Sequence, residues 1–328
     1  MALLLSRKDV ASVLTMEDCL KAVETAFGEL AAGNAVMPQR AVIPVPAHQG
    51  LFLGMPAYIG GDMNALGLKL VTVYPQNPAQ HQLPTTLGTL MLCDPATGKV
   101  AAIMDAGFLT AMRTGAASGV ACKYLAREDA KRGVIFGAGV QAQKQLIAVQ
   151  AVRPLEKVWV VDIIPEARDR FAGAMAEQLG IPVEPTEEVE AAVREADIVI
   201  TASSSPEPIF DGRWLSPGTH ICNIGSHSPK ARELDTTTVK RAKFVADLKE
   251  ANLAEAGDIL IPIEEGAVTE AHIYASLGEI VLGRKPGREN PEEITVFKSC
   301  GLAIQDMSTA AAVYRAAREK GIGVDVDL

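Results

Sequence analysis

Short apolar runs, separated by clusters of glycine, proline and asparagine, fill the chain up to about residue 105. Their length and their β-branched and aromatic residues predict strands at residues 40–45, 50–58, 65–74, 86–94 and 100–105. The last two runs flank an Asp-Pro-Ala-Thr-Gly sequence that is typical of a hairpin turn. We therefore expect this part of the chain to contain an antiparallel sheet.

Apolar residues recur at helical spacing near both ends of the chain. Ser6 or Asp9 is expected to begin a first helix and Thr15 a second, because these side chains cap helix N-termini. We expect the C-terminal helix to return to the first domain, since a chain rarely leaves two folded units without a connecting element. That helix is predicted at residues 301–319, with an apolar face formed by Ala303, Met307, Ala310, Val313 and Ala317.

Strands and helices alternate from residue 134 onwards, after an Ala- and Gly-rich helical segment at residues 109–126. This alternation is typical of a parallel sheet that is covered by helices on both faces. Strands are predicted at residues 134–136, 158–161, 198–201, 220–224, 244–245 and 294–298, and helices at residues 140–152, 165–179, 187–195 and 273–281.

A glycine turn follows the first of these strands. Gly137, Gly139 and Ala142 have G-x-G-x-x-A spacing directly after Val-Ile-Phe and at the start of a helix. The first glycine permits a tight turn, the second a close approach of the backbone to a pyrophosphate, and the alanine close packing of the helix on the strand. The free N–H groups at the helix start, around Val140 and Gln141, would face the phosphates. An ordinary turn between core elements is the alternative interpretation.

Asp162 ends the next predicted strand, about 25 residues after Gly137. An acid at this place accepts hydrogen bonds from the ribose hydroxyls of a dinucleotide, and it would repel a 2′-phosphate. Strand, glycine turn, helix, strand and acid thus predict a Rossmann-type domain that binds NAD, with NADP disfavoured.

Composition narrows the class of protein further. The 328 residues are 48% hydrophobic and 22% charged, enough for about two globular domains, and the net charge of −9 argues against nucleic acid as a partner. The five cysteines and five histidines are scattered, so the sequence predicts no metal site. No apolar run is long enough for a membrane helix, and we expect a cytoplasmic protein with free thiols.

Three basic residues lie where packing alone would not put them. Lys69 falls on the apolar face of a predicted strand, which indicates either a sheet edge or a polar cavity. Arg113 lies near a helix start, where the dipole disfavours a cation, so we expect a carboxylate or a phosphate as its partner. A surface position is the alternative for Arg113. For Arg40 a solvated position at a strand start is the better interpretation from its spacing.

Two loops follow predicted strands of the parallel sheet, where the carboxyl ends of strands line a ligand crevice. One loop begins with Gly225 and contains His227, whose near-neutral pKa suits proton transfer. The other contains Ser203, which is expected to touch the cofactor. Both loops could equally be ordinary polar loops.

The whole chain resembles the ornithine cyclodeaminase/mu-crystallin family. The resemblance rests on Gly67-Leu68-Lys69, on the Met-Asp and Thr-Ala-Met-Arg-Thr-Gly-Ala sequences at residues 104–105 and 110–116, on the glycine turn at residues 137–142, and on Arg232-Glu233-Leu234. It implies a homodimer with an α/β fold. A Rossmann-type doubly wound parallel sheet at residues 116–302 would accompany a discontinuous α+β substrate and dimerisation domain at residues 1–115 and 303–328.

The resemblance also implies roles for individual residues. Arg40, Lys69 and Arg113 match positions that bind the substrate carboxylate, and Lys69 would lie beside the reacting carbon and nitrogen. Thr114 and Gly139 would contact the cofactor phosphates, together with Arg113, and Asp162 would contact the ribose.

One departure from the family pattern bears on the reaction. Ornithine cyclodeaminases carry an aspartate in the loop that here reads Gly225-Ser226-His227-Ser228-Pro229. An imidazole cannot supply the fixed negative charge that holds an ornithine ammonium. We therefore expect an NAD(H)-dependent oxidoreductase that reduces a small cyclic α-imino acid or interconverts an α-amino acid with its keto acid and ammonia. Lys69 or His227 would handle the proton. Ornithine cyclodeaminase activity is the first alternative, and a non-catalytic, crystallin-like binding protein is the second.

Overall fold

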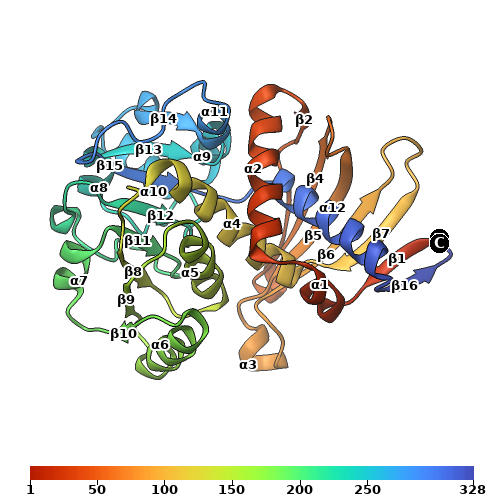
Figure 1. Cartoon of the computed structure of the whole chain (residues 1–328), viewed down its shortest axis with the longest axis horizontal. Coiled ribbons are helices and arrows are strands. Elements are labelled where there is room, and N and C mark those ends of the chain that lie inside the picture. The colour runs from red at the N-terminus through yellow and green to blue at the C-terminus, as the bar shows by residue number, and fades with distance from the viewer. The chain divides into compact units, whose positions relative to one another are not determined.

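A computed structural model describes residues 1–328 and divides them into two compact units. The first contains Met1–Arg113 and Leu302–Leu328, and the second contains Thr114–Gly301. The sequence-based boundaries lie at residues 115 and 303, and the structure changes over at Arg113 and at Leu302. Figure 1 shows both units, coloured along the chain from red at the N-terminus to blue at the C-terminus.

The first unit is built on a mostly antiparallel sheet. Its strands run in the order β16-β1-β7-β6-β5-β4-β2, with β3 also paired to β4, and only β1 and β7 are parallel. The predicted hairpin turn before β7 is confirmed, since Gly98 has a φ of 74° there. The strands are β1 (Ala2–Leu5), β2 (Ala35–Val36), β3 (Ala41–Val45), β4 (Gly50–Ile59), β5 (Ala65–Val73), β6 (Thr86–Cys93), β7 (Val100–Asp105) and β16 (Val324–Val326).

Two long helices, α2 (Met16–Ala32) and α12 (Ala303–Lys320), pack against each other beside this sheet (Figure 1). Thr15 caps α2, as predicted, and Gly33 ends this helix in the left-handed conformation. The apolar face predicted for the C-terminal helix is buried, and α12 belongs to the first unit. The short helices are α1 (Arg7–Val13), which is capped by Ser6, η1 (Pro46–His48) and α3 (Asn77–His81).

The second unit is a doubly wound α/β fold around an entirely parallel sheet. The strand order is β10-β9-β8-β11-β12-β15-β13-β14, so the winding reverses beside β8. This reversal is the switch point at which such sheets bind ligands. The strands are β8 (Arg132–Phe136), β9 (Lys157–Val161), β10 (Val183–Pro185), β11 (Ile198–Thr201), β12 (His220–Asn223), β13 (Ala242–Ala246), β14 (Ile273–Ser276) and β15 (Ile294–Lys298).

Helices bury both faces of this sheet. Val134 and Phe136 of β8 belong to one apolar core, and Ile135 between them belongs to the other. Strands that are buried on both faces read as continuous apolar runs, which is why the sequence predicted them. The helices are α5 (Val140–Val152), α6 (Pro165–Leu179), α7 (Val189–Glu195), α8 (Thr236–Arg241), α9 (Lys249–Glu255), α10 (Gly257–Glu264), α11 (Leu277–Val281), η2 (Gly212–Trp214), η3 (Glu270–His272) and the last part of α4 (Gly107–Leu125).

The helix predicted at residues 273–281 is wrong in its first half. Residues 273–276 form β14, which pairs in parallel with β13, and α11 begins only after Ser276. Ser276 and Glu279 form a capping box that fixes this start. The edge strands β10 and β16, the short strand β1 beside β16, and the helices α9 and α10 were not predicted from the sequence. No helix in the structure combines the length and hydropathy that a membrane span requires.

Candidate active site

A buried cluster of charges lies in the first unit, between the sheet and α12. Lys69 is on β5, which has β4 on one side and β6 on the other, so the sheet-edge interpretation is wrong. Its side chain is 1% exposed, and its ammonium Nζ lies 2.7 Å from Oδ2 of Asp306. The second carboxylate oxygen of Asp306 accepts a hydrogen bond from Nε of Arg113 at 2.8 Å. One fully buried carboxylate therefore holds two cations.

Arg113 lies in the second turn of α4 and is 5% exposed, so the surface interpretation is wrong for this residue. Besides the bond to Asp306, it donates from Nη1 to Oε1 of Gln305 at 2.6 Å. The expected anionic partner is thus a carboxylate of the chain itself.

Gly67 explains how α12 comes so close to the sheet. A Cβ atom at this position would lie 2.2 Å from the carbonyl oxygen of Met91 and 2.9 Å from the sulfur of Met307. No side chain fits there, so Gly-Leu-Lys is a packing requirement as much as a chemical one. The glycine lets Asp306, the residue before Met307, reach Lys69.

Burial lowers the pKa of Lys69 from 10.5 to about 7. The negative charge of Asp306 opposes this shift, while the positive charges of Arg113 and of Arg40 add to it. Arg40 is half-buried and lies just before β3. It is close enough to Lys69 for its charge to lower the lysine pKa. A lysine with this pKa can give up and take back a proton near neutral pH.

Asp306 and Gln305 were not identified from the sequence. Both are fully buried in the first turns of α12, and their neighbours Ala303, Ile304 and Met307 are buried too. The available signal was an acid and an amide inside a run that is otherwise small and apolar, since such residues are rarely buried without a partner.

The glycine turn of the second unit fits a dinucleotide phosphate. Gly137 has a φ of 103°, and a Cβ there would lie 2.6 Å from the carbonyl oxygen of Ala202. A Cβ at Gly139 would meet no atom of the chain within 4 Å, so nothing in the protein itself requires a glycine at this position. No side chain caps the start of α5, and Oε1 of Gln141 is buried without a hydrogen-bond partner. Val140, the first residue of α5, is largely exposed.

Asp162 follows β9 and is hydrogen-bonded to the backbone of the glycine turn. Its Oδ2 accepts a hydrogen bond from the backbone N–H of Ala138 at 2.8 Å, and its Oδ1 accepts one from Ile164 at 2.9 Å. The carboxylate is half-buried and fixed in direction by these two bonds. Its remaining lone pairs can accept from ribose hydroxyls.

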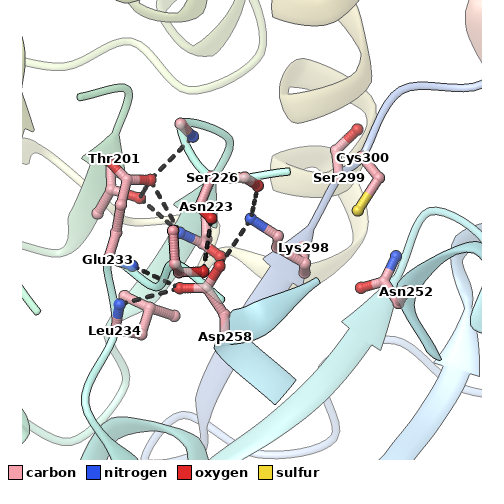
Figure 2. A network of polar contacts seen from close by, with 12 residues as sticks. Thr201, Asn223, Ser226, Glu233, Leu234, Asn252, Asp258, Lys298, Ser299 and Cys300 are labelled. Carbon is pink, nitrogen blue, oxygen red and sulfur yellow. Dashed lines mark hydrogen bonds and ion pairs between the residues drawn. The ribbon is translucent and has the colours of Figure 1, made fainter. Parts of the chain in front are cut away.

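Glu233 joins the two loops that the sequence analysis singled out (Figure 2). Its carboxylate accepts five hydrogen bonds of 2.6–3.1 Å, from Oγ1 of Thr201, N and Oγ of Ser203, Nδ2 of Asn223 and N of Gly225. Three of these groups are N–H groups, which can only donate, so they favour the ionised carboxylate, although burial raises its pKa. Gly225 is needed here, because a Cβ would lie 2.2 Å from the carbonyl oxygen of Ser203.

A fully buried ion pair supports the same loop. Nζ of Lys298 lies 2.9 Å from Oδ2 of Asp258, and it also donates to the carbonyl oxygen of Ser226 (Figure 2). Oδ1 of Asp258 accepts from the backbone N–H groups of Glu233 and Leu234 at 2.8 and 3.0 Å. Burial works against the charge of Lys298, but the carboxylates around it raise its pKa overall. The residue before His227 is thus anchored, while His227 itself is exposed.

The structure therefore groups the candidate residues within each unit. In the first unit Lys69 and Arg113 both pair with Asp306, and the positive charge of Arg40 acts on Lys69. In the second unit Ser203 and Gly225 share Glu233, and Asp162 supports the glycine turn. The carbonyl oxygen of Thr114 accepts a hydrogen bond from Nε2 of Gln145 on α5 at 3.1 Å. Glu233, Asp258 and Lys298 were not assigned a role from the sequence.

Comparison with known proteins agrees with this arrangement of motifs. The profile of the ornithine cyclodeaminase/mu-crystallin family matches residues 1–321. The chain belongs to this family. Membership of the ornithine cyclodeaminase/mu-crystallin family confirms the resemblance seen in the sequence and the α/β fold class expected from it.

Three similar members of the family illustrate its range. Δ1-pyrroline-2-carboxylate reductase of Bacillus cereus is 39% identical over 326 residues, or 99% of each chain. The structure of Thermococcus litoralis Δ1-pyrroline-2-carboxylate reductase in complex with NADH and L-proline has a TM-score of 0.95 and 48% identity, covering 99% of this chain and 100% of the other. An archaeal alanine dehydrogenase dimer with bound NAD has a TM-score of 0.94 and 36% identity, covering 100% and 99%.

Proposed function

We propose that this protein is an NAD(H)-dependent oxidoreductase that reduces a small cyclic α-imino acid of the Δ1-pyrroline-2-carboxylate or Δ1-piperideine-2-carboxylate type. Interconversion of an α-amino acid with its keto acid and ammonia is the same chemistry on an open-chain imine. The observation that carries the proposal is the buried Lys69, whose ammonium shares one carboxylate with Arg113. The relatives that act on such imines, or that bind NADH with L-proline, support it.

In this proposal the basic residues of the first unit bind the substrate. Arg40 and Arg113 attract the substrate carboxylate, and charge-assisted hydrogen bonds orient it. Asp306 keeps Arg113 and Lys69 in fixed positions, so that little reorganisation is needed during the reaction. NADH, when bound, supplies the hydride that reduces the carbon of the C=N bond.

Lys69 is the proposed acid. As the imine carbon is reduced, the imine nitrogen gains electron density and takes a proton from the Lys69 ammonium. The balance is one imine, one NADH and one proton giving one amine and one NAD⁺. A pKa of about 7 suits this transfer, because at neutral pH Lys69 is present in both its protonated and its neutral form and can release its proton readily. His227, on an exposed loop, is the second candidate for this proton.

The chain's own residues support NAD(H) as the cofactor. The uncapped start of α5 and the open space at Gly139 would accept a pyrophosphate, and the unpartnered Gln141 oxygen can accept a hydrogen bond only from a donor such as a cofactor hydroxyl. Val140 is the first residue of α5. Thr114 lies on α4, and its carbonyl oxygen accepts a hydrogen bond from Gln145 of α5. Asp162 would accept from the ribose and would repel a 2′-phosphate.

The loop at residues 225–229 supports reduction over ornithine cyclisation. It contains His227 and no carboxylate side chain, so it offers no fixed negative charge to a substrate ammonium. A crystallin-like binding protein without turnover is the remaining candidate, and the intact Lys69 and Arg113 cluster argues against it.

The deciding experiment is a substrate panel. Purified protein is mixed with NADH and either Δ1-pyrroline-2-carboxylate, Δ1-piperideine-2-carboxylate, or pyruvate with ammonia, and NADH oxidation is followed by absorbance. We expect the cyclic imines to be reduced. If none oxidises NADH while ornithine with NAD yields proline and ammonia, cyclodeaminase activity replaces the proposal. Cofactor binding without any turnover would support the binding protein.

We further propose a homodimer that associates through the first unit. In the register of the sheet, Ile43, Phe52, Thr72 and Leu87 form a row across four strands, on the face opposite Lys69. Ile43, Leu70 and Leu87 on this face are 56%, 37% and 40% exposed. Exposed apolar side chains that share one face of a sheet are typical of a protein interface. The dimer of the archaeal alanine dehydrogenase supports the proposal.

A reducing compartment such as the cytoplasm is proposed for the protein. All five cysteines are free in the structure, and four of them are buried. Free thiols persist where glutathione and thioredoxin keep them reduced.

A further inference from the structure

Three potential metal ligands meet in the core of the second unit, although the sequence spacing gave no sign of a metal site. Cys122 comes from α4, and His220 and Cys222 come from β12, two residues apart and so on one face of the strand. The two sulfurs are 3.5 Å apart, and the sulfur of Cys222 is 3.4 Å from Nε2 of His220. All three ligand atoms lie within 4.8 Å of one another, and all three side chains are fully buried.

The hydrogen bonds around His220 fix which ring nitrogen is free. Oγ1 of Thr295 donates its only proton to the carbonyl oxygen of Leu125 at 3.0 Å, and it accepts from Arg288 at 3.1 Å. It must therefore also accept from Nδ1 of His220, at 2.8 Å. The proton of the imidazole is on Nδ1, and the lone pair of Nε2 points to the cysteines. A histidine that binds a metal is usually held in this way, by a second hydrogen bond from its other nitrogen.

The separations suit a tetrahedral ion. An ion about 2.3 Å from each sulfur places two sulfurs about 3.8 Å apart, and a nitrogen at about 2.0 Å lies about 3.5 Å from a sulfur. The observed 3.5 Å and 3.4 Å are within a few tenths of an ångström of these values. Little movement of the side chains would close the site.

Charge selects the kind of ion. Two thiolates and a neutral imidazole carry a charge of −2, which a divalent ion cancels, and Cys122 and Cys222 belong to an apolar core where a net charge would be costly. Thiolate and imidazole ligands together are the set that Zn²⁺ prefers.

A fourth ligand is available on the same helix. Ser118 lies one turn before Cys122 on the same face of α4, and its carbonyl oxygen is 4.0 Å from the sulfur of Cys222. Its hydroxyl oxygen is fully buried and has no hydrogen-bond partner. A buried hydroxyl without a partner is costly, and coordination to an ion would satisfy it.

We propose that Cys122, His220 and Cys222, with the hydroxyl of Ser118 in the fourth position, bind a structural zinc ion that ties α4 to β12. The ion enters during folding, because the ligands are fully buried in the folded unit. This site is independent of the proposed oxidoreductase activity, since none of its ligands belongs to the Lys69 cluster or to the glycine turn.

The test is the metal content of the untagged full-length protein, produced with zinc in the medium and dialysed before elemental analysis. We expect about one zinc per chain, falling to about a tenth or less in the Cys222→Ser and His220→Asn variants. Cys19→Ser is the matched control, because Cys19 is equally buried but lies in the first unit, against Thr309. This variant should keep its zinc. Protein produced with cobalt should show a thiolate-to-cobalt charge-transfer band that the Cys222→Ser variant lacks.

Two results would overturn the proposal. One is a wild-type protein with no bound zinc or cobalt and five thiols that react after unfolding, which would leave a chain of S–H hydrogen bonds in the core. The other is a mass about 2 Da lower per chain that is restored by reductant, which would indicate a disulfide between Cys122 and Cys222. Both measurements use the wild-type chain, so the proposal is testable even if a variant fails to fold.

Discussion

Lys69 is the residue in which the chemistry of the first unit is concentrated. Its strand position and neighbours could be read from the sequence, but the choice between a sheet edge and a polar cavity could not. That choice depends on which strands flank β5 and on Asp306, which follows more than two hundred residues later in the chain. Local patterns carry no information about a partner at such a distance.

Replacing Lys69 with methionine should remove the proposed acid and one of the cations near the substrate. We expect kcat/KM for the cyclic imine to fall by about 100-fold or more. The variant Lys21→Met is a suitable control, because Lys21 is an exposed residue of α2. A Lys69→Met enzyme that kept its full kcat/KM would exclude Lys69 from the mechanism.

Asp306→Asn tests the carboxylate that Lys69 and Arg113 share. The negative charge of Asp306 raises the pKa of Lys69 against the effect of burial, so its loss should lower that pKa below about 7. If protonated Lys69 is the acid, kcat for imine reduction falls as the pH rises through its pKa. The alkaline limb of the kcat profile should therefore move to lower pH in Asp306→Asn.

Gln305→Glu is the counterpart of this variant, because it adds a negative charge next to Arg113, and its alkaline limb should move to higher pH. An alkaline limb that stays in place in Asp306→Asn would assign the titration to another group, such as His227.

Asp162 is expected to set the choice of cofactor. Asp162→Ala removes the carboxylate that would repel a 2′-phosphate, and it leaves the backbone N–H of Ala138 without its acceptor. The ratio of kcat/KM for NADH over NADPH should drop by about 10-fold or more. Unchanged preference for NADH would show that this carboxylate does not determine it.

At the scale of elements, the sequence predicted most strands and long helices, because their apolar periodicity reflects burial directly. Residues 273–276 were misassigned since a short apolar run suits a strand or a helix, and pairing with β13 decided for a strand. The strands β1, β10 and β16 are three or four residues long, too short for a period to appear. Hydrogen-bond networks such as that of Glu233 join elements far apart in the chain and left no local pattern.

The ends of β11, β12 and β15 are held together by the Glu233 and Lys298 network. Lys298→Met should leave the Asp258 carboxylate buried without its cation, at a cost of about 3–5 kcal/mol in the free energy of unfolding, measured by urea denaturation. The double variant Asp258→Asn with Lys298→Met should recover part of this loss, because no unpaired charge remains.

The matched control for this network is Lys157→Met. Lys157 pairs with Glu184 at 2.7 Å on the surface, where an ion pair contributes about 0–1 kcal/mol. An equal loss in the free energy of unfolding for Lys298→Met and Lys157→Met would show that the buried pair stabilises the protein no more than a surface pair does.

At the scale of the whole molecule, the exposed apolar face of the first unit should govern association. Ile43→Asp places a charge in the row formed by Phe52, Thr72 and Leu87. We expect the wild type to be a dimer by light scattering at micromolar concentration and this variant to shift to the monomer. Leu328→Asp, at the exposed C-terminus, should remain a dimer. A monomeric wild type would refute the proposed interface.

The division of the first unit into two chain segments bears on how the protein is made. The second unit is continuous, so all of its residues are synthesised before Leu302. The first unit must wait for α12 and for β16, which pairs with β1 from the opposite end of the chain. Until then Lys69 has no Asp306, and the apolar face that α12 covers has no cover. Translation therefore completes the chain of the Rossmann unit first, and the residues from Leu302 onwards then complete the charge cluster proposed to act on the substrate.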